Sequence, residues 1–83
     1  MKILEIRDNG GKTIDRYTVV YDVIRDSKGN YEAVGMNAEP FHPQGFGQHC
    51  TALPGRRLGK KIKFRDLPKD CQKLVNRDLG ITE

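Results

Sequence analysis

The chain has 83 residues, of which 36% are hydrophobic and 31% are charged, and its formal net charge at pH 7 is +4. This length allows one domain, residues 1–83, with one small core. No apolar run follows Met1 and Lys2, so the sequence predicts neither a secretory signal nor a membrane-spanning segment. We therefore expect a cytoplasmic protein with reduced cysteines and, because so small a core stabilises weakly alone, a homo-oligomer.

The first half of the sequence predicts three antiparallel strands, at residues 2–7, 13–25 and 31–37. Asn and Gly in the intervening segments 8–11 and 26–30 favour tight turns. In the second strand the tyrosine-bearing face should be the more buried one. Val20 and Ile24 lie on its opposite face and imply some cover there too.

Residues 38–59 show no helical or strand periodicity, which predicts a long loop rich in glycine and proline. Within it, residues 42–45 suit a type I turn. Residues 61–65 could add a short edge strand, in which lysines would discourage unwanted pairing.

The C-terminal part predicts one helix that begins after Asp66, with Asp66 as its cap and Pro68 in its first turn. Gly80 ends it, because glycine accepts the left-handed conformation. One apolar stripe runs along it, formed by Leu67, Cys71, Leu74, Val75 and Leu79. The expected fold is thus α+β, with a small antiparallel sheet of three to four strands, one C-terminal helix and a long functional loop.

The centre of the loop indicates capture of an anionic, base-bearing ligand. The aromatic ring of Phe46 could stack on a nucleobase, and the side chains of Gln44 and Gln48 could read its edges. The glycines that flank the ring would expose backbone amides. The candidate ligand-binding residues of this loop are His42, Gln44, Gly45, Phe46, Gly47, Gln48 and His49. The alternative is that the aromatic rings fold back into the core and the glycines serve only turns.

A dense basic run follows the loop. Residues 56–65 carry six positive charges and no acidic residue, and such a run favours an anionic partner through its summed potential. We expect Arg56, Arg57, Lys60 and Lys61 to supply charge next to the loop. The alternative is a solvated surface that only maintains solubility.

Two other hypotheses use the same loop. A small metal- or thiol-dependent enzyme could be centred on His42, His49 and Cys50, although their spacing matches no standard zinc pattern. Cys50 could equally be a small buried residue that anchors the loop. In a purely structural alternative, the loop swaps between subunits and completes a dimer core.

The segment Pro40-Phe41-His42-Pro43-Gln44-Gly45-Phe46-Gly47-Gln48-His49 resembles one in small proteins of bacteriophages and prophages for which no activity is established. The segment Phe64-Arg65-Asp66-Leu67-Pro68-Lys69-Asp70-Cys71-Gln72-Lys73-Leu74-Val75 resembles the same group. The resemblance implies a phage-type accessory protein that acts inside a bacterial host cell. By analogy, such a protein could block a host defence system by binding a nucleotide signal, a nucleic acid or a host protein. The sequence names no cofactor, metal or catalytic residue.

Overall fold

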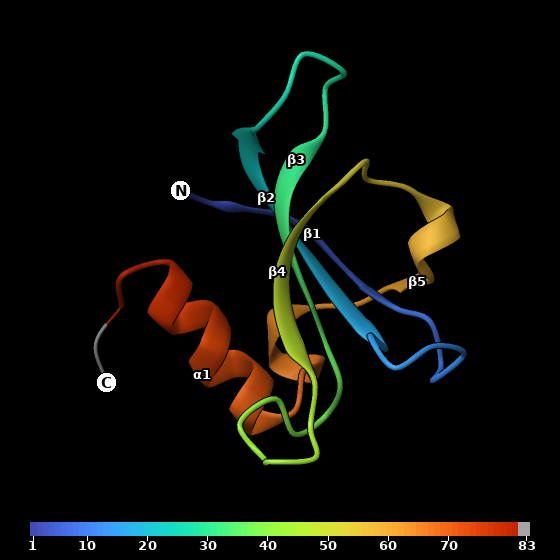
Figure 1. Ribbon diagram of the computed structural model, residues 1–83, viewed down its shortest axis with the longest axis vertical. Coiled ribbons are helices and arrows are strands. Elements are labelled where there is room, and N and C mark those ends of the chain that lie inside the picture. Colours follow the sequence, from blue (N-terminus) through green and yellow to red (C-terminus); the bar gives the residue numbers. More distant parts are fainter. Residues whose placement is uncertain (82–83) are drawn as a thin grey trace.

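The computed structural model describes residues 1–81 and shows an antiparallel sheet with one C-terminal helix packed on one face (Figure 1). The fold class expected from the sequence is confirmed, with one strand more than the upper estimate. The elements in chain order are β1 Ile3–Asp8, β2 Tyr17–Ile24, β3 Tyr31–Met36, β4 Gly47–Ala52, the 3-10 turn η1 Arg56–Leu58, β5 Lys60–Lys61, the 3-10 turn η2 Phe64–Asp66, and α1 Lys69–Asp78.

The sheet is a meander in the order β4-β3-β2-β1-β5, and all neighbours are antiparallel. A tight turn closes the β2–β3 connection as predicted, but the β1–β2 connection spans residues 9–16, so β2 begins at Tyr17 rather than at residue 13 and Ile14 is left exposed. β4 was not expected, because Gly47–Ala52 lies inside the predicted loop. β5 consists of two residues paired to the end of β1, and of the strand predicted at 61–65 only Lys61 belongs to it, since residues 64 and 65 lie in η2.

The core lies between α1 and the face of the sheet that carries Tyr17, Val19 and Tyr21. These three side chains alternate along β2 and are at most 7% exposed, which confirms the burial expected for this face. The helix contributes its predicted apolar stripe, and Cys71 is fully buried in it. Burial of these groups supplies the main favourable free energy of folding.

The second face of the sheet is covered as well. Val20 and Ala33 lie on it and are fully buried. In Figure 1, η1 lies on the side of the sheet opposite α1. On the same face as Val20 and Ala33, the side chain of Asp15 packs against Gly35. The cover expected over Ile24 is absent, however, because Ile24 is 61% exposed. The register of β2 against β3 shifts between Val20 and Ile24, and this irregularity carries Ile24 away from the covered region.

Both ends of α1 have clear causes. Asp66 does not cap the helix as predicted, because its carboxylate accepts the Lys63 N–H at 3.0 Å and closes η2 instead. The helix then starts after Pro68, which occupies the N-cap position with extended ψ rather than the predicted place in the first turn. At the other end Gly80 has a φ of 76°. Its N–H and that of Ile81 donate back to helix carbonyls, which is a Schellman ending.

Within residues 1–81, the helical segments are too short and too polar to cross a lipid bilayer.

Candidate functional site

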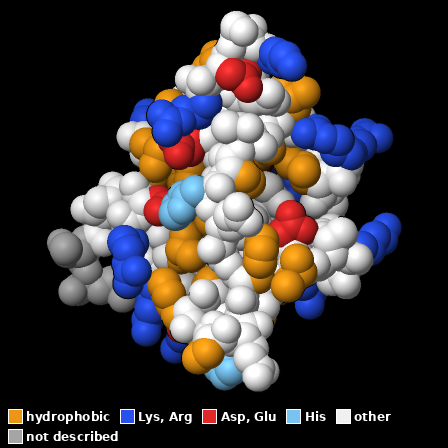
Figure 2. Space-filling view, viewed as in Figure 1, with side chains coloured by type: hydrophobic (Ala, Val, Ile, Leu, Met, Phe, Trp, Pro, Cys, Tyr) orange, Lys and Arg blue, Asp and Glu red, His pale blue; other side chains and the backbone are white. Residues whose placement is uncertain are grey.

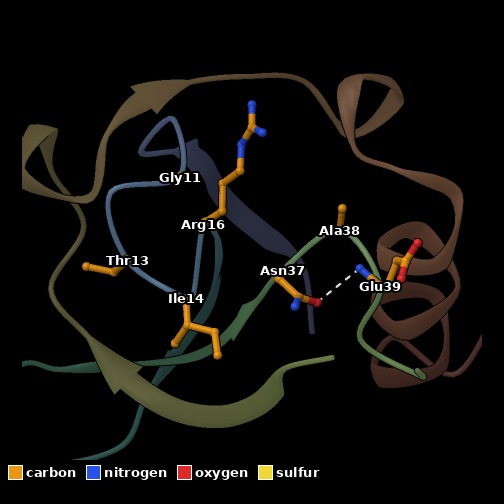
Figure 3. A pocket seen from close by; sticks show the side chains of 7 residues that line it. All are labelled: Gly11, Thr13, Ile14, Arg16, Asn37, Ala38 and Glu39. Atoms are coloured by element: carbon orange, nitrogen blue, oxygen red, sulfur yellow. Dashed lines mark hydrogen bonds between the residues drawn. The ribbon is translucent and has the colours of Figure 1, made fainter. Parts of the chain in front are cut away.

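Two hollows lie on either side of the β1–β2 connection. The first has a volume of about 410 Å³ and is shown in Figure 3. It is lined by Gly11, Thr13, Ile14, Arg16, Asn37, Ala38 and Glu39. Its one cation, Arg16, is already paired with Asp8 at 2.8 Å. This hollow is therefore mixed in character and offers no free positive charge.

The second hollow has a volume of about 550 Å³, and we call it the basic hollow. Its lining comes from the β1–β2 turn and from the segment of η1 and β5. The lining residues are Asp8, Asn9, Gly10, Lys12, Arg56, Arg57, Gly59 and Lys60. Segments far apart in the sequence meet here because Asp8 pairs with Lys60 across the β1–β5 ladder.

The four cations of the basic hollow, which are Lys12, Arg56, Arg57 and Lys60, are exposed and have no ion-pair partner within residues 1–81. The hollow contains one carboxylate, Asp8, and Arg16 engages it through two hydrogen bonds of 2.8 and 3.2 Å. These bonds hold the pKa of Asp8 below its usual range. Because the negative charge of Asp8 is already balanced by Arg16, it cancels little of the positive potential that the four cations produce at the surface of the hollow.

The backbone amides of the turn are not available to a ligand. The Asp8 carboxylate accepts the Gly10 N–H at 2.8 Å. The Asn9 side-chain oxygen accepts the N–H groups of Gly11 and Lys12 at 2.8 and 3.0 Å. An anion in the basic hollow therefore cannot use a nest formed by the amides of this turn and would be bound mainly by the charged side chains.

A partly buried ion pair holds η1 against the sheet. Glu5 receives two hydrogen bonds from the Arg7 guanidinium, at 2.9 and 3.0 Å, and one from the Gly55 N–H at 3.0 Å. The bond from Arg7 is the main reason that the pKa of Glu5 is lowered. Gly59 completes the attachment, because its backbone lies directly against Asp8 and Asn9 and leaves no room for a side chain. These contacts hold the backbone of η1 close to the β1–β2 turn.

The loop between β3 and β4 is folded back on itself and on α1. The Asn37 side chain accepts the N–H groups of Glu39 and Phe46 at 3.0 and 3.1 Å. The Asn37 carbonyl accepts the thiol of Cys71 at 3.0 Å. The guanidinium of Arg77 lies 4.9 Å from the centre of the Phe41 ring. The predicted turn at residues 42–45 is present, with a hydrogen bond of 2.8 Å from the Gly45 N–H to the His42 carbonyl.

Both glycines beside Phe46 have a packing reason. A Cβ atom at Gly45 would overlap the carbonyl oxygen of Glu39. One at Gly47 would lie 3.0 Å from Pro40 and 3.3 Å from Leu74 of the helix. The N–H groups of Gly45 and Phe46 are both used within the loop. Both glycines allow a close approach of neighbouring atoms, and of the two only Gly47 leaves its amide directed away from the loop and β3.

The structure does not bring the loop and the basic run to one hollow. Phe46 is half-buried, whereas Gln44 and Gln48 are exposed, and the lining of the basic hollow includes none of the candidate loop residues. Of the predicted charge-bearing residues, Arg56, Arg57 and Lys60 line it. Lys61 lies next to them and pairs with Arg7 across the ladder. Sequence reasoning missed Lys12 and the turn at residues 8–10, since only the pairing of β1 with β5 brings them there.

The histidines and Cys50 are also apart. His42 accepts the Gln44 N–H within the loop turn at 3.1 Å, whereas His49 contacts Asp78 of α1 at 2.8 Å. Cys50 follows His49 in a strand, so its side chain points to the other face. Cys50 is exposed rather than a buried anchor. No group of three potential metal ligands exists among residues 1–81.

A search of protein-family models, of curated proteins and of solved structures gives no match to this chain.

Proposed function

We propose that this protein binds a phosphate-bearing ligand in the basic hollow and catalyses no reaction on it. The observation that supports the proposal is a hollow of about 550 Å³ that is lined by four cations, none of which forms an ion pair with another of residues 1–81. Arg and Lys are the residues that proteins use to bind phosphate, Arg as a planar fork and Lys as a point charge. The positive charges of these four side chains reinforce one another, because the one carboxylate in the lining, Asp8, is already paired with Arg16.

The chemistry of the lining narrows the mode of binding. The hollow contains no aromatic side chain, so it offers no platform on which a base could stack. Recognition there rests on phosphate and on charge, as in sequence-independent nucleic-acid binding. The same phosphate chemistry could come from a nucleic-acid backbone or from a free nucleotide, and the stacking role expected for Phe46 stays a separate prediction.

The test is fluorescence anisotropy with a labelled single-stranded oligonucleotide over a range of salt concentrations, with ATP and tripolyphosphate as unlabelled competitors. We expect the triple variant R56A/R57A/K60A to lose most of its affinity. Each phosphate contact contributes about 0.7 to the slope of log K against log salt for single strands, so the slope should fall by about 2.

The matched control is K28A/K69A/K73A, which removes the same number of positive charges from exposed positions outside the hollow. Its affinity and salt slope should stay close to those of the unmodified protein. Equal losses in the two triple variants would mean that only net charge matters and would overturn the site. Competition by ATP at low concentration would identify a nucleotide, whereas competition only by longer oligonucleotides would identify a nucleic-acid backbone.

A further inference from the structure

β4 forms one edge of the sheet and is uncovered along its length. It pairs with β3 on one side only, and five of its six residues are exposed. Its register against β3 runs without a shift from Tyr31–Ala52 to Met36–Gly47. The edge is therefore a regular strand with a free hydrogen-bonding side.

The two edges of this sheet differ in their protection. Soluble proteins normally protect an edge strand with lysines, proline, a bulge, a covering segment or very short length. β5, at the opposite edge, has two residues and both are lysines. β4 contains none of these features, since its sequence is Gly-Gln-His-Cys-Thr-Ala. Figure 2 shows mainly uncharged atoms along the middle of this side of the molecule, with acidic side chains beside them and Lys and Arg nearer the rim.

The hydrogen bonds of the neighbouring ladder determine which backbone groups of β4 are free. The Asn37 N–H donates to the Phe46 carbonyl at 2.9 Å, which makes these two residues a hydrogen-bonded pair. Such pairs alternate with non-bonded pairs along an antiparallel ladder. It follows that Gly47, His49 and Thr51 direct their N–H and C=O groups outward, away from β3.

We propose that β4 pairs in antiparallel fashion with β4 of a second copy of this chain, about a two-fold axis at His49. His49 then faces His49 of the second copy, and Gly47 faces Thr51 of the second copy. This register joins all the outward groups and forms about six backbone hydrogen bonds. The two sheets become one continuous sheet, with the basic hollows towards its distant ends.

A second copy fits this edge for two reasons. The outward positions are symmetric about His49, so a two-fold operation matches each donor with an acceptor. The strand also contains no lysine, arginine or carboxylate, so two chains that each carry a net charge of +4 meet without opposed like charges along β4. Gly47, Cys50 and Ala52 are small, which lets the two backbones approach.

The test measures the oligomeric state by analytical ultracentrifugation, with Thr51→Pro as the main variant and Thr51→Val as its control. Proline removes an outward N–H without removing a bond to β3, and proline is tolerated on edge strands. We expect a dimer for the unmodified protein and for Thr51→Val. Thr51→Pro loses two symmetric hydrogen bonds, so its dissociation constant should rise about 30-fold or more.

A second measurement covers the case in which Thr51→Pro does not fold. In the proposed register the two Cys50 side chains are offset by two residues across the axis, at about 7–8 Å. A bifunctional maleimide of similar length should therefore link two chains, and the link should vanish in Cys50→Ser. A monomer at all accessible concentrations would overturn the proposal. So would a dimer that neither crosslinks at Cys50 nor responds to a folded Thr51→Pro.

Discussion

Replacing Gly59 with alanine should detach η1 from the β1–β2 turn, because Gly59 is the point of closest backbone approach between the two segments. The φ of Gly59 is 116°, a value that other residues rarely adopt. An added Cβ would overlap the Asp8 carbonyl oxygen and would lie 2.6 Å from the Asn9 nitrogen. Backbone at Gly59 cannot retreat without moving β5 away from β1.

The cost follows from two contributions. Forcing a side chain into this backbone region costs about 1–3 kcal/mol, and overpacking against backbone adds about 1–3 kcal/mol. A chain of this length has a total free energy of unfolding of about 4–12 kcal/mol. Each kcal/mol lowers the Tm of a domain of this size by about 4–8 °C, so we expect a decrease of at least about 10 °C.

The control is Gly29→Ala. Gly29 also has a positive φ, 83°, but no atom lies within 4 Å of an added Cβ. The substitution therefore introduces backbone strain without a steric clash and should lower the free energy of unfolding by about 1–2 kcal/mol. Thermal unfolding followed by circular dichroism measures both variants, and oligonucleotide affinity should fall only in Gly59→Ala. Equal Tm values for the two variants would refute the close packing of η1 on the turn.

Three further outcomes are expected. Arg7 lowers the pKa of Glu5, so this carboxylate stabilises the fold above its unfolded pKa, near 4.5, and that stability is lost as the pH falls through the folded pKa. The Tm measured from pH 6 to pH 3 should therefore fall less steeply in Glu5→Gln than in the unmodified protein. Parallel curves of Tm against pH would contradict the reasoning. Asp78→Ala leaves the hydroxyl of the fully buried Tyr21 without the carboxylate to which it donates at 2.7 Å. The free energy of unfolding measured in urea should fall by about 1–3 kcal/mol, and an unchanged midpoint would be inconsistent with this bond. Burial raises the pKa of the Cys71 thiol to about 11, so iodoacetamide should label only Cys50 in the folded protein and both thiols in urea, and rapid native labelling of Cys71 would argue against its burial.

The parts of the fold that local chemistry determines could be predicted from the sequence. The stripe that contains Cys71 and Leu74 has the spacing of one helix face, and the Asn and Gly residues at 8–11 and 26–30 indicate where the chain turns between β1, β2 and β3, although not the full length of the β1–β2 connection. β4 could not be predicted in this way, since its residues have weak strand preference and no alternation. It forms because β3 offers a complete set of backbone partners, which is a tertiary effect.

In the candidate site too, some residues could be predicted from local sequence, whereas others depend on contacts between distant segments. The density of charge at residues 56–65 identified Arg56 and Arg57 directly. Lys12 has no such signal, because it joins the basic hollow only through the non-local pairing of Asp8 with Lys60. The packing role of the glycines around Phe46 could not be predicted for a related reason. Their purpose lies in atoms such as the Glu39 carbonyl, whose position a linear pattern does not contain.

The meander order of the sheet also has a consequence for how the chain folds. Neighbouring strands from β1 to β4 are consecutive in the chain, so their contacts close short loops and can form early. β5 is the exception, since it must return across the whole sheet to reach β1. We expect the transition state to contain the β2–β3 hairpin and to lack β5, with φ-values near zero around Gly59. A ligand in the basic hollow would then slow unfolding and leave the folding rate almost unchanged.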